Sequence, residues 1–411
     1  MKLDRLYNAI KQKLLDINWE EKLCGTFDES YSIFINKLNH SMEGNVPKRT
    51  QVYKKQNLYM NRKAMRLKNK KQKLWKKYTL TRCVADYGKF VRIKNELRLL
   101  TRTLRRNFET TLAIKSKDSP KQFWSYVKSK LKTKSRIPTL TKSDGTKALS
   151  SQEKAEALND FFGSVYQEES DTDVPPVTKN YSNEPLSTIQ ITDEMVINKL
   201  KSLDPGKSTG PDGWHPYLLQ SLADSLCTPL RILFNKSLCE GIVPSQWLEA
   251  YITAIFKKGQ KSVISNYRPV SITTVICKIM ESIIRDHIVS YMTTNKLFTD
   301  EQHGFVPKRD CMTNLLIAME EWTAAIEIGN DIDVIYTDFA KAFDSVPHKR
   351  LLIKLKSIGI EDKVLQWIKS FLNIRKHSVC VEGEFSDWVH VNSGIPQGSV
   401  LAWTYTFCDF Y

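Results

Sequence analysis

Residues 333–344 read D-V-I-Y-T-D-F-A-K-A-F-D, a stretch in which an acid, Asp338, follows a short apolar run. Residues 334–336, Val-Ile-Tyr, are of types that favour β-strands. Residues 348–357 then show the apolar spacing of a helix, which Gly359 closes. The pattern predicts an α/β arrangement in which Asp338 stands at the end of a buried strand.

A carboxylate at the edge of an α/β sheet lies where ligands and metals usually bind. A single aspartate is nevertheless a weak signal, because surface and helix-capping aspartates are common. The other blocks of the sequence have to decide between a ligand-binding acid and an ordinary surface acid.

The net charge of the chain is concentrated in one segment. The 411 residues have a formal net charge of +17, and residues 48–136 contain 29 lysines and arginines but only four acids. The remainder of the chain is therefore net acidic. A basic block of this kind pairs with phosphates, and aromatic residues interleave with it as packing or stacking groups: Trp75, Tyr78, Tyr87, Phe90 and Phe108.

The same segment shows helical apolar spacing. Leu67 and Leu74 are seven residues apart, and so are Phe90, Leu97 and Leu104. This spacing predicts an antiparallel helical pair or a helix that packs on a partner. Nucleic-acid contact and a solvated basic face both remain open. The candidate nucleic-acid-binding residues are Lys70, Lys71, Lys73, Lys76, Lys77, Arg102, Arg105 and Arg106.

Several classes of protein are disfavoured by composition. No run of about 18 apolar residues occurs, and the charged start lacks the apolar core of a signal peptide, so we expect no membrane span and an intracellular, nuclear or cytoplasmic protein. The eight cysteines include no C-x-x-C pair, which argues against a zinc knuckle or a disulfide framework and favours buried free thiols.

Composition also divides the chain. Residues 1–136 are predicted to form a basic helical connector, and residues 137–190 a helix followed by a flexible acidic and proline-containing linker. Residues 191–411 alternate helical and strand patterns, which predicts a third region of mixed α/β (α+β) structure.

Five sequence blocks follow one another in this third region. They are S-T-G-P-D-G from Ser208, A-x-I-x-x-x-F-K-K-G over residues 250–259 with N-Y-R-P-V-S from Asn266, Q-H-G-F-V-P-K-R from Gln302, the Asp338 block, and S-G-I-P-Q-G-S-V-L from Ser393. Residues 191–411 resemble the reverse transcriptase domain of non-LTR (LINE-type, jockey-like) retrotransposons. A lone P-Q-G would be weak, but five ordered blocks are highly specific.

The resemblance implies right-hand polymerase fingers and a partial palm, without a thumb. It implies RNA-directed DNA synthesis from an RNA template and a DNA primer with deoxynucleoside triphosphates. Strand extension of this kind uses two divalent ions, Mg²⁺ or Mn²⁺, which carboxylates hold against the attacking and leaving oxygens. Asp338 matches the first metal ligand and is the candidate catalytic residue.

The resemblance also implies a nucleotide-binding set. Backbone after Asp338 would cradle the triphosphate, the aromatic at position 343 would pack against the sugar, and basic residues would grip the phosphates. An ordinary reading stays open for several of these positions, because Phe343 could be a core aromatic, Lys341 a surface lysine and residues 396–398 a plain tight turn. The candidates are Lys257, Lys258, Arg268, Phe339, Ala340, Lys341, Ala342, Phe343, Gln397 and Gly398.

The sequence departs from the family after the P-Q-G block. The family's next motif, an aromatic-Ala-Asp-Asp turn, does not appear before Tyr411, so Asp338 is the one metal-binding carboxylate of three, and Asp344 is expected to cap a turn. Two hypotheses follow, a truncated polymerase that is inactive as this chain and a non-catalytic nucleic-acid-binding remnant. The oligomeric state cannot be predicted.

Overall fold

The computed structural model describes residues 2–43, 59–118, 120–130, 137–142, 144–167, 169, 184–338 and 341–401. These residues form a mixture of helices and β-strands, as the predicted fold class requires. The chain divides into two compact units, one of residues 48–136 and one of residues 1–47 with 137–411. This division differs from the predicted regions 1–136, 137–190 and 191–411.

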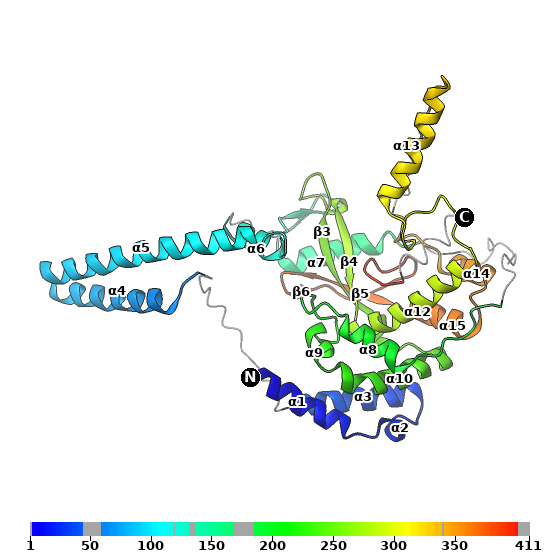
Figure 1. Ribbon diagram of the computed structural model, residues 1–411, viewed down its shortest axis with the longest axis horizontal. Helices are drawn as coiled ribbons and strands as arrows, with labels where there is room; N and C mark the ends of the chain where they lie inside the picture. Colours follow the sequence, from blue (N-terminus) through cyan, green and yellow to red (C-terminus); the bar gives the residue numbers. More distant parts are fainter. Residues whose placement is uncertain are drawn as a thin grey trace. The chain divides into compact units, whose positions relative to one another are not determined.

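Within residues 48–136, the described residues 59–118 and 120–130 form a helical hairpin followed by a third helix. Helices α4 (Arg62–Thr81) and α5 (Val84–Ile114) lie side by side in Figure 1, and α6 (Pro120–Lys130) follows them. Helix α4 ends at Thr81, and the capping residue Arg82 has a left-handed φ of +52°. The predicted antiparallel helical pair is confirmed. Among the described residues of α4 and α5, buried apolar side chains are limited to Ala64 and Ile93.

A buried acid fastens the closed end of this hairpin. The carboxylate of Asp86 accepts hydrogen bonds from Lys77 Nζ and Thr81 Oγ1, both at 3.1 Å, and Lys89 Nζ lies 3.7 Å away. The hydrogen bond from Lys77 is the main reason that the pKa of Asp86 is lowered. The ionised acid therefore ties α4 to α5 across the turn.

Helices α1 (Lys2–Leu15), α2 (Trp19–Lys22) and α3 (Phe27–Met42) belong to the larger unit, where they contact α10 (Ala223–Glu240). Phe27 and Phe34 are fully buried, and the ring of Trp247 lies 6.4 Å from that of Phe27. Burying these aromatic side chains stabilises the packing of the three helices on α10.

The main sheet has the strand order β4-β3-β5-β6, and β7 also pairs with β5. Its strands are β3 (Glu249–Phe256), β4 (Tyr267–Ile272), β5 (Lys376–Val381), β6 (Glu384–Phe385) and β7 (Val389–His390). Strand β3 pairs antiparallel with β4 and parallel with β5. The parallel pair brings the region around residue 250 beside the region around residue 377.

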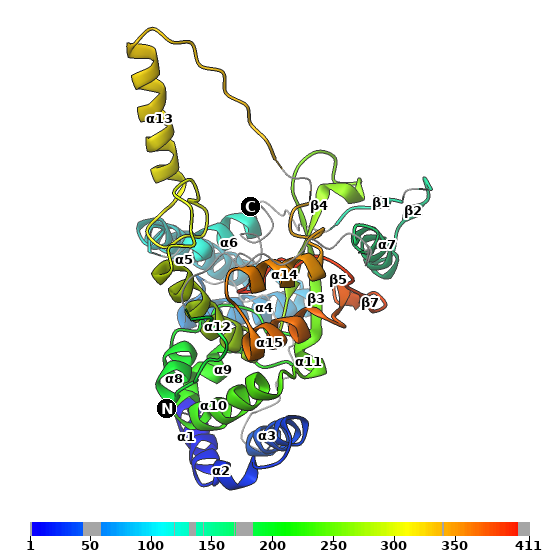
Figure 2. The same cartoon turned by 90° about the vertical axis from the view of Figure 1, so that its right-hand side faces the viewer.

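Helices cover the sheet and build two hydrophobic cores. The larger core includes residues of α10, α12 and α15, and the smaller lies between the sheet and α7, which Figure 2 shows beside β5. The remaining elements are α7 (Ser151–Gly163), α8 (Asp193–Lys201), α9 (Pro216–Ser221), α11 (Ser245–Leu248), α12 (Val275–Thr294), α13 (Cys311–Glu327), α14 (His348–Ser357), α15 (Asp362–Leu372), β1 (Leu140–Thr141), β2 (Lys147–Ala148) and the 3₁₀ turn η2 (Ile264–Asn266).

The strand predicted before Asp338 is wrong. Residues 331–338 have no regular secondary structure, and Ile335 and Tyr336 are 87% and 84% exposed. β-Propensity produces a strand only where a neighbouring strand pairs with its backbone and packs against its side chains. No described strand pairs with this segment, and the preceding helix α13 has no buried residue either.

The cysteine and membrane expectations can be compared with the described residues. The seven cysteines there are free thiols, but only Cys277 is buried, so the expectation of buried thiols is wrong for the others. Across the described ranges no helix combines the length and the apolar character that a membrane span requires.

Candidate functional site

The β3–β4 hairpin carries the basic residues that the sequence predicts for triphosphate binding. Lys257 and Lys258 follow β3 directly, and Arg268 lies on β4 opposite Ile255. The backbone N–H of Lys257 donates to the carbonyl of Asn266 at 2.8 Å and closes the turn. All three basic side chains are exposed. The hairpin therefore presents them at one end, where a polyphosphate can reach them.

The loop before α14 turns sharply at Lys341. Its φ is +54°, in the left-handed region that residues with side chains rarely adopt. The carbonyl of Lys341 accepts hydrogen bonds from the N–H groups of Asp344 at 2.9 Å and Ser345 at 3.2 Å. This turn directs the chain back toward the loop that contains P-Q-G.

Residues 393–395 fasten the two loops together. The N–H of Gly394 donates to the carbonyl of Val346 at 2.8 Å, and the N–H of Ile395 donates to the carbonyl of Phe343 at 2.7 Å. Gly394 has a φ of +80°, and a Cβ there would lie 2.5 Å from the carbonyl oxygen of Asp344. Glycine is required at this position because a side chain would collide with backbone.

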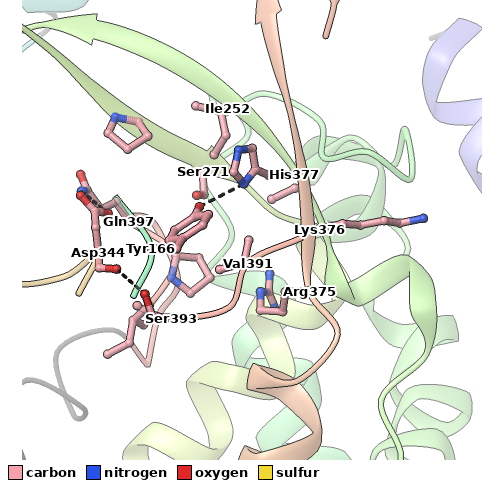
Figure 3. A pocket seen from close by; sticks show the side chains of 15 residues that line it. Tyr166, Ile252, Ser271, Asp344, Arg375, Lys376, His377, Val391, Ser393 and Gln397 are labelled. Carbon is pink, nitrogen blue, oxygen red and sulfur yellow. Dashed lines mark hydrogen bonds between the residues drawn. The ribbon is translucent and has the colours of Figure 1, made fainter. Parts of the chain in front are cut away.

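Asp344 and Gln397 face one another across the two loops (Figure 3). The side-chain nitrogen of Gln397 donates to both carboxylate oxygens of Asp344, at 2.9 and 3.1 Å. The backbone carbonyl of Gln397 accepts a hydrogen bond from the N–H of Ser271 on β4 at 2.8 Å. Gln397 thus links the Asp338 block to the strand that carries Arg268. Because the amide nitrogen donates to Asp344, the amide oxygen of Gln397 is left to accept a hydrogen bond from a ligand.

A buried carboxylate holds the other end of the P-Q-G loop. Glu281 on α12 is fully buried, and its Oε2 accepts hydrogen bonds from Ser399 Oγ at 2.5 Å and from the N–H of Val400 at 2.8 Å. Gly398 has a φ of +130°, and a Cβ there would lie 2.5 Å from the carbonyl oxygen of Ser271. The loop is therefore fixed at both ends before any ligand binds.

A small cavity of about 30 Å³ lies between these loops and the sheet (Figure 3). Tyr166 Oη and His377 Nδ1, on its wall, are 3.1 Å apart. Burial lowers the pKa of His377 to about 4 and raises the pKa of Tyr166, so both are neutral at pH 7. Burial also raises the pKa of Asp344, while the hydrogen bond from Gln397 lowers it. A cavity of this size holds about one water molecule and is too small for a nucleotide. We therefore assign the side chains on its wall a role in supporting the loops.

Asp338 stands apart from this supported region. It is exposed and lies on the extended segment 331–338. Within the described residues, no group of three or more His, Cys, Asp and Glu side chains could hold a metal ion. A pair of Mg²⁺ or Mn²⁺ ions needs several carboxylate oxygens held close together. The described residues therefore do not fit the predicted two-metal centre, and Asp338 alone supplies one ligand.

The predicted triphosphate cradle is described in part. Phe339 and Ala340 lie outside the described residues. Lys341 is exposed, and its Nζ lies 5.1 Å from the ring centroid of Phe161. Ala342 and Phe343 are half-buried, and Phe343 packs against the larger hydrophobic core. The packing of Phe343 therefore supports the alternative that it is a core aromatic residue.

The predicted nucleic-acid-binding residues lie on the helical hairpin. Their side chains are exposed except that of Lys71, which is half-buried. Two of them are engaged within the hairpin, since Lys77 pairs with Asp86 at 3.1 Å and Arg105 Nε pairs with Glu109 at 2.8 Å. The other six form no ion pair within residues 59–118 and 120–130: Lys70, Lys71, Lys73, Lys76, Arg102 and Arg106.

Sequence reasoning missed the residues that support the loops. Asp344 was expected to cap a turn, but its side chain holds Gln397. Glu281 lies among apolar residues of α12 that repeat at helical spacing, and an acid on such a face is a signal that could have marked it. Nothing in the local sequence relates Tyr166 to His377, because 211 positions separate them.

One known protein family matches the part of the chain that contains this site. Residues 255–406 match the family described as Reverse transcriptase (RNA-dependent DNA polymerase). The matched range includes β3 from Ile255 onward, β4, the Asp338 block and the P-Q-G loop. The supported loops thus lie in the part of the chain that matches this family.

The individual relatives of this chain come from transposable elements. The chain is 25% identical over 359 residues to the "Probable RNA-directed DNA polymerase from transposon BS" of Drosophila melanogaster, covering 84% of this chain and 39% of that protein. It is 30% identical over 212 residues to the "RNA-directed DNA polymerase from mobile element jockey" of Drosophila funebris, covering 51% and 23%.

A more distant relative is the "Retrovirus-related Pol polyprotein from type-1 retrotransposable element R2" of Popillia japonica, 24% identical over 173 residues, covering 42% and 24%. The predicted resemblance to the reverse transcriptases of non-LTR retrotransposons is confirmed. The chain spans less than two fifths of the length of these three relatives.

Proposed function

We propose that this chain is the part of an RNA-directed DNA polymerase that holds the incoming nucleotide and the nucleic acid. Its substrates would be deoxynucleoside triphosphates, an RNA template and a DNA primer. The observation that carries this proposal is the meeting of three distant sequence blocks. Ser271 on β4, Asp344 and Gln397 are joined by hydrogen bonds of 2.8 to 3.1 Å.

The proposed roles follow from charge and position. Lys257, Lys258 and Arg268 are exposed cations at one end of the β3–β4 hairpin, which suits the β and γ phosphates of a nucleotide. Gln397 and Gly398 occupy a loop that is fixed at both ends, which suits contact with a base or a template strand. In polymerase terms these elements would be fingers and part of the palm.

The proposal includes no chemical step for this chain. A divalent metal would supply charge neutralisation at the reacting phosphate in the family's reaction, but the described residues assemble no such centre. We therefore propose that the 411-residue chain binds its substrates and does not extend a primer by itself. Both hypotheses drawn from the sequence share this point, since each treats the chain as non-catalytic and related to polymerases.

Binding measurements test the first half of the proposal. We expect a fluorescent deoxynucleoside triphosphate to bind the purified chain, and Arg268→Ala and Gln397→Ala each to weaken it about tenfold or more, the range for a lost charged hydrogen bond. Glu320→Ala, an exposed change on α13, serves as the control. Unchanged affinity in both site variants would contradict the proposed nucleotide site.

Primer extension tests the second half. With Mg²⁺ or Mn²⁺, all four nucleotides and an annealed RNA template and DNA primer, we expect no extension by the 411-residue chain. Extension that depends on the template and disappears in Asp338→Ala would show that the chain is an active polymerase. Deleting residues 48–136 should remove most of the salt-dependent affinity for nucleic acid.

A further inference from the structure

The helical hairpin carries an aromatic surface that the proposed phosphate contacts do not use. The rings of Trp75 on α4 and Phe90 on α5 have centroids 4.8 Å apart at an angle of 48°. Tyr78 lies 5.6 Å from Trp75, and Tyr87 lies 6.1 Å from Phe90, which completes a cluster of four rings. Trp75 is 46% exposed, so part of its ring is open to solvent.

An open groove of about 760 Å³ borders this surface. Trp75 and Phe90 form its apolar part, and the remaining lining residues are polar or basic and come from α4. They are Asn69, Lys71, Gln72, Lys73 and Lys76. A groove of this kind combines a ring face with amide groups and cations.

The charge of α4 is of one sign. Its 20 residues include nine lysines and arginines and no acid. Lys77 is engaged by Asp86. In contrast, no ion pair among residues 59–118 and 120–130 involves Lys71, Lys73 or Lys76. The groove therefore has an exposed aromatic face beside cations that a ligand can neutralise.

A chain of alternating phosphates and unpaired bases has the matching chemistry. Lysines attract the phosphates, and a base whose face is free can stack on an exposed indole. A double helix has its base faces covered by neighbouring bases, so it would engage the lysines and leave Trp75 unused. A helix of a partner protein would need a broad surface of apolar side chains, whereas Trp75 and Phe90 are the two apolar residues among the seven that line this groove.

We propose that Trp75 and Phe90 form a stacking site for an unpaired base of single-stranded nucleic acid, with Lys71, Lys73 and Lys76 contacting the adjacent phosphates. This inference rests on the proposed nucleic-acid binding by residues 48–136. It adds that the hairpin distinguishes single strands by their bases and does not merely attract phosphate.

The test uses the full 411-residue chain and two labelled DNA strands of equal length. One strand carries mixed bases and the other carries abasic sites throughout, so both have the same number of phosphates. We expect Trp75→Leu to weaken binding of the base-bearing strand about 5- to 100-fold, the range for loss of one stacked base. Binding of the abasic strand should stay unchanged, and Trp75→Phe should keep most of the affinity for the base-bearing strand.

Two further variants separate stacking from charge and position. Phe108→Leu changes an aromatic residue of the same hairpin whose ring contacts are Tyr59 and Tyr126, and it should bind both strands like the unchanged chain. A triple change of Lys71, Lys73 and Lys76 to Gln should weaken both strands and reduce the salt dependence. Trp75→Met is measured beside Trp75→Leu, and circular dichroism checks the helix content of both, because Leu and Met have similar helix propensities and neither carries an aromatic ring.

The outcomes distinguish the two proposals. Equal binding of the base-bearing strand by Trp75→Leu, Trp75→Met and the unchanged chain would overturn the stacking site, including the case in which this surface docks a protein. Nucleic-acid binding by residues 48–136 would survive that result. If the unchanged chain bound neither strand, the proposed binding and the stacking site would both be wrong.

Discussion

The side-chain nitrogen of Gln397 lies 2.9 and 3.1 Å from the two carboxylate oxygens of Asp344, 53 positions earlier in the chain. The pair joins the loop that follows Asp338 to the P-Q-G loop. It also determines the orientation of the amide, because the nitrogen must face the carboxylate. A residue that the family resemblance assigns to nucleotide contact is thus positioned by an acid that the sequence offered only as a turn cap.

Replacing Asp344 should release Gln397. We expect Asp344→Ala to lower the free energy of unfolding by about 1 to 2 kcal/mol, because the amide nitrogen loses a charged acceptor. Asp344→Asn retains one acceptor oxygen and should lose less. A double-mutant cycle with Gln397→Ala, measured by urea unfolding, isolates the pair. Additive effects of the two single changes would show that the hydrogen bond contributes nothing to stability.

Glu281 should matter more for stability than its position within an apolar helix suggests. Glu281→Ala leaves Ser399 Oγ and the N–H of Val400 without their acceptor in a buried place, so we expect a loss of about 2 to 4 kcal/mol. Glu281→Gln keeps one oxygen and should be milder. Glu320→Ala, at an exposed position of α13, is the control for thermal or urea unfolding. A loss no larger than that of the control would refute the supporting role of Glu281.

Asp212 should make stability depend on pH. Burial raises the pKa of Asp212 to about 6, and its Oδ2 has no hydrogen-bond partner in the part of the chain that the structure describes. In the unfolded chain the carboxyl of Asp212 has its ordinary pKa of 3.8. The folded state therefore loses stability as the pH rises from about 4 through 6.

Asp212→Asn removes that loss and keeps the oxygen that accepts from Trp214 N–H at 3.3 Å. We expect the variant to be more stable than the unchanged chain by about 3 kcal/mol at pH 7 to 8, and equal to it near pH 4. Urea unfolding across this pH range measures the difference, with exposed Asp333→Asn as the control. A difference that does not change with pH would contradict the assignment to Asp212.

The two neighbouring arginines of α5 should differ in nucleic-acid binding. Arg105 is engaged by Glu109 at 2.8 Å, whereas Arg102 is exposed and has no ion pair among the described residues of the hairpin. We expect Arg102→Gln to reduce the slope of log affinity against log salt by about 0.7 to 0.9, and Arg105→Gln to change it little. Fluorescence anisotropy titrations measure both slopes. If the two variants had the same slope, the prediction would be wrong, and the ion pair between Arg105 and Glu109 would have to open when nucleic acid binds.

Local patterns predicted those elements that complete themselves within a short stretch. The spacing of Leu67, Leu74 and Phe90 indicated a helical pair, and the structure has α4 and α5. The strand before Asp338 was wrong because a strand needs a neighbour, and local composition cannot tell whether one is present.

The candidate site divides in the same way. The sequence by itself predicted the resemblance to reverse transcriptases, which the comparisons confirm, and it proposed Arg268 and Gln397 as nucleotide contacts, because ordered motifs keep chemical groups at fixed positions. Only the tertiary structure decided that Asp344 holds Gln397 and that Glu281 holds Ser399 and Val400. These partners lie 53 to 119 positions apart. Hydrogen bonds over such separations depend on how helices and strands pack, which no local spacing encodes.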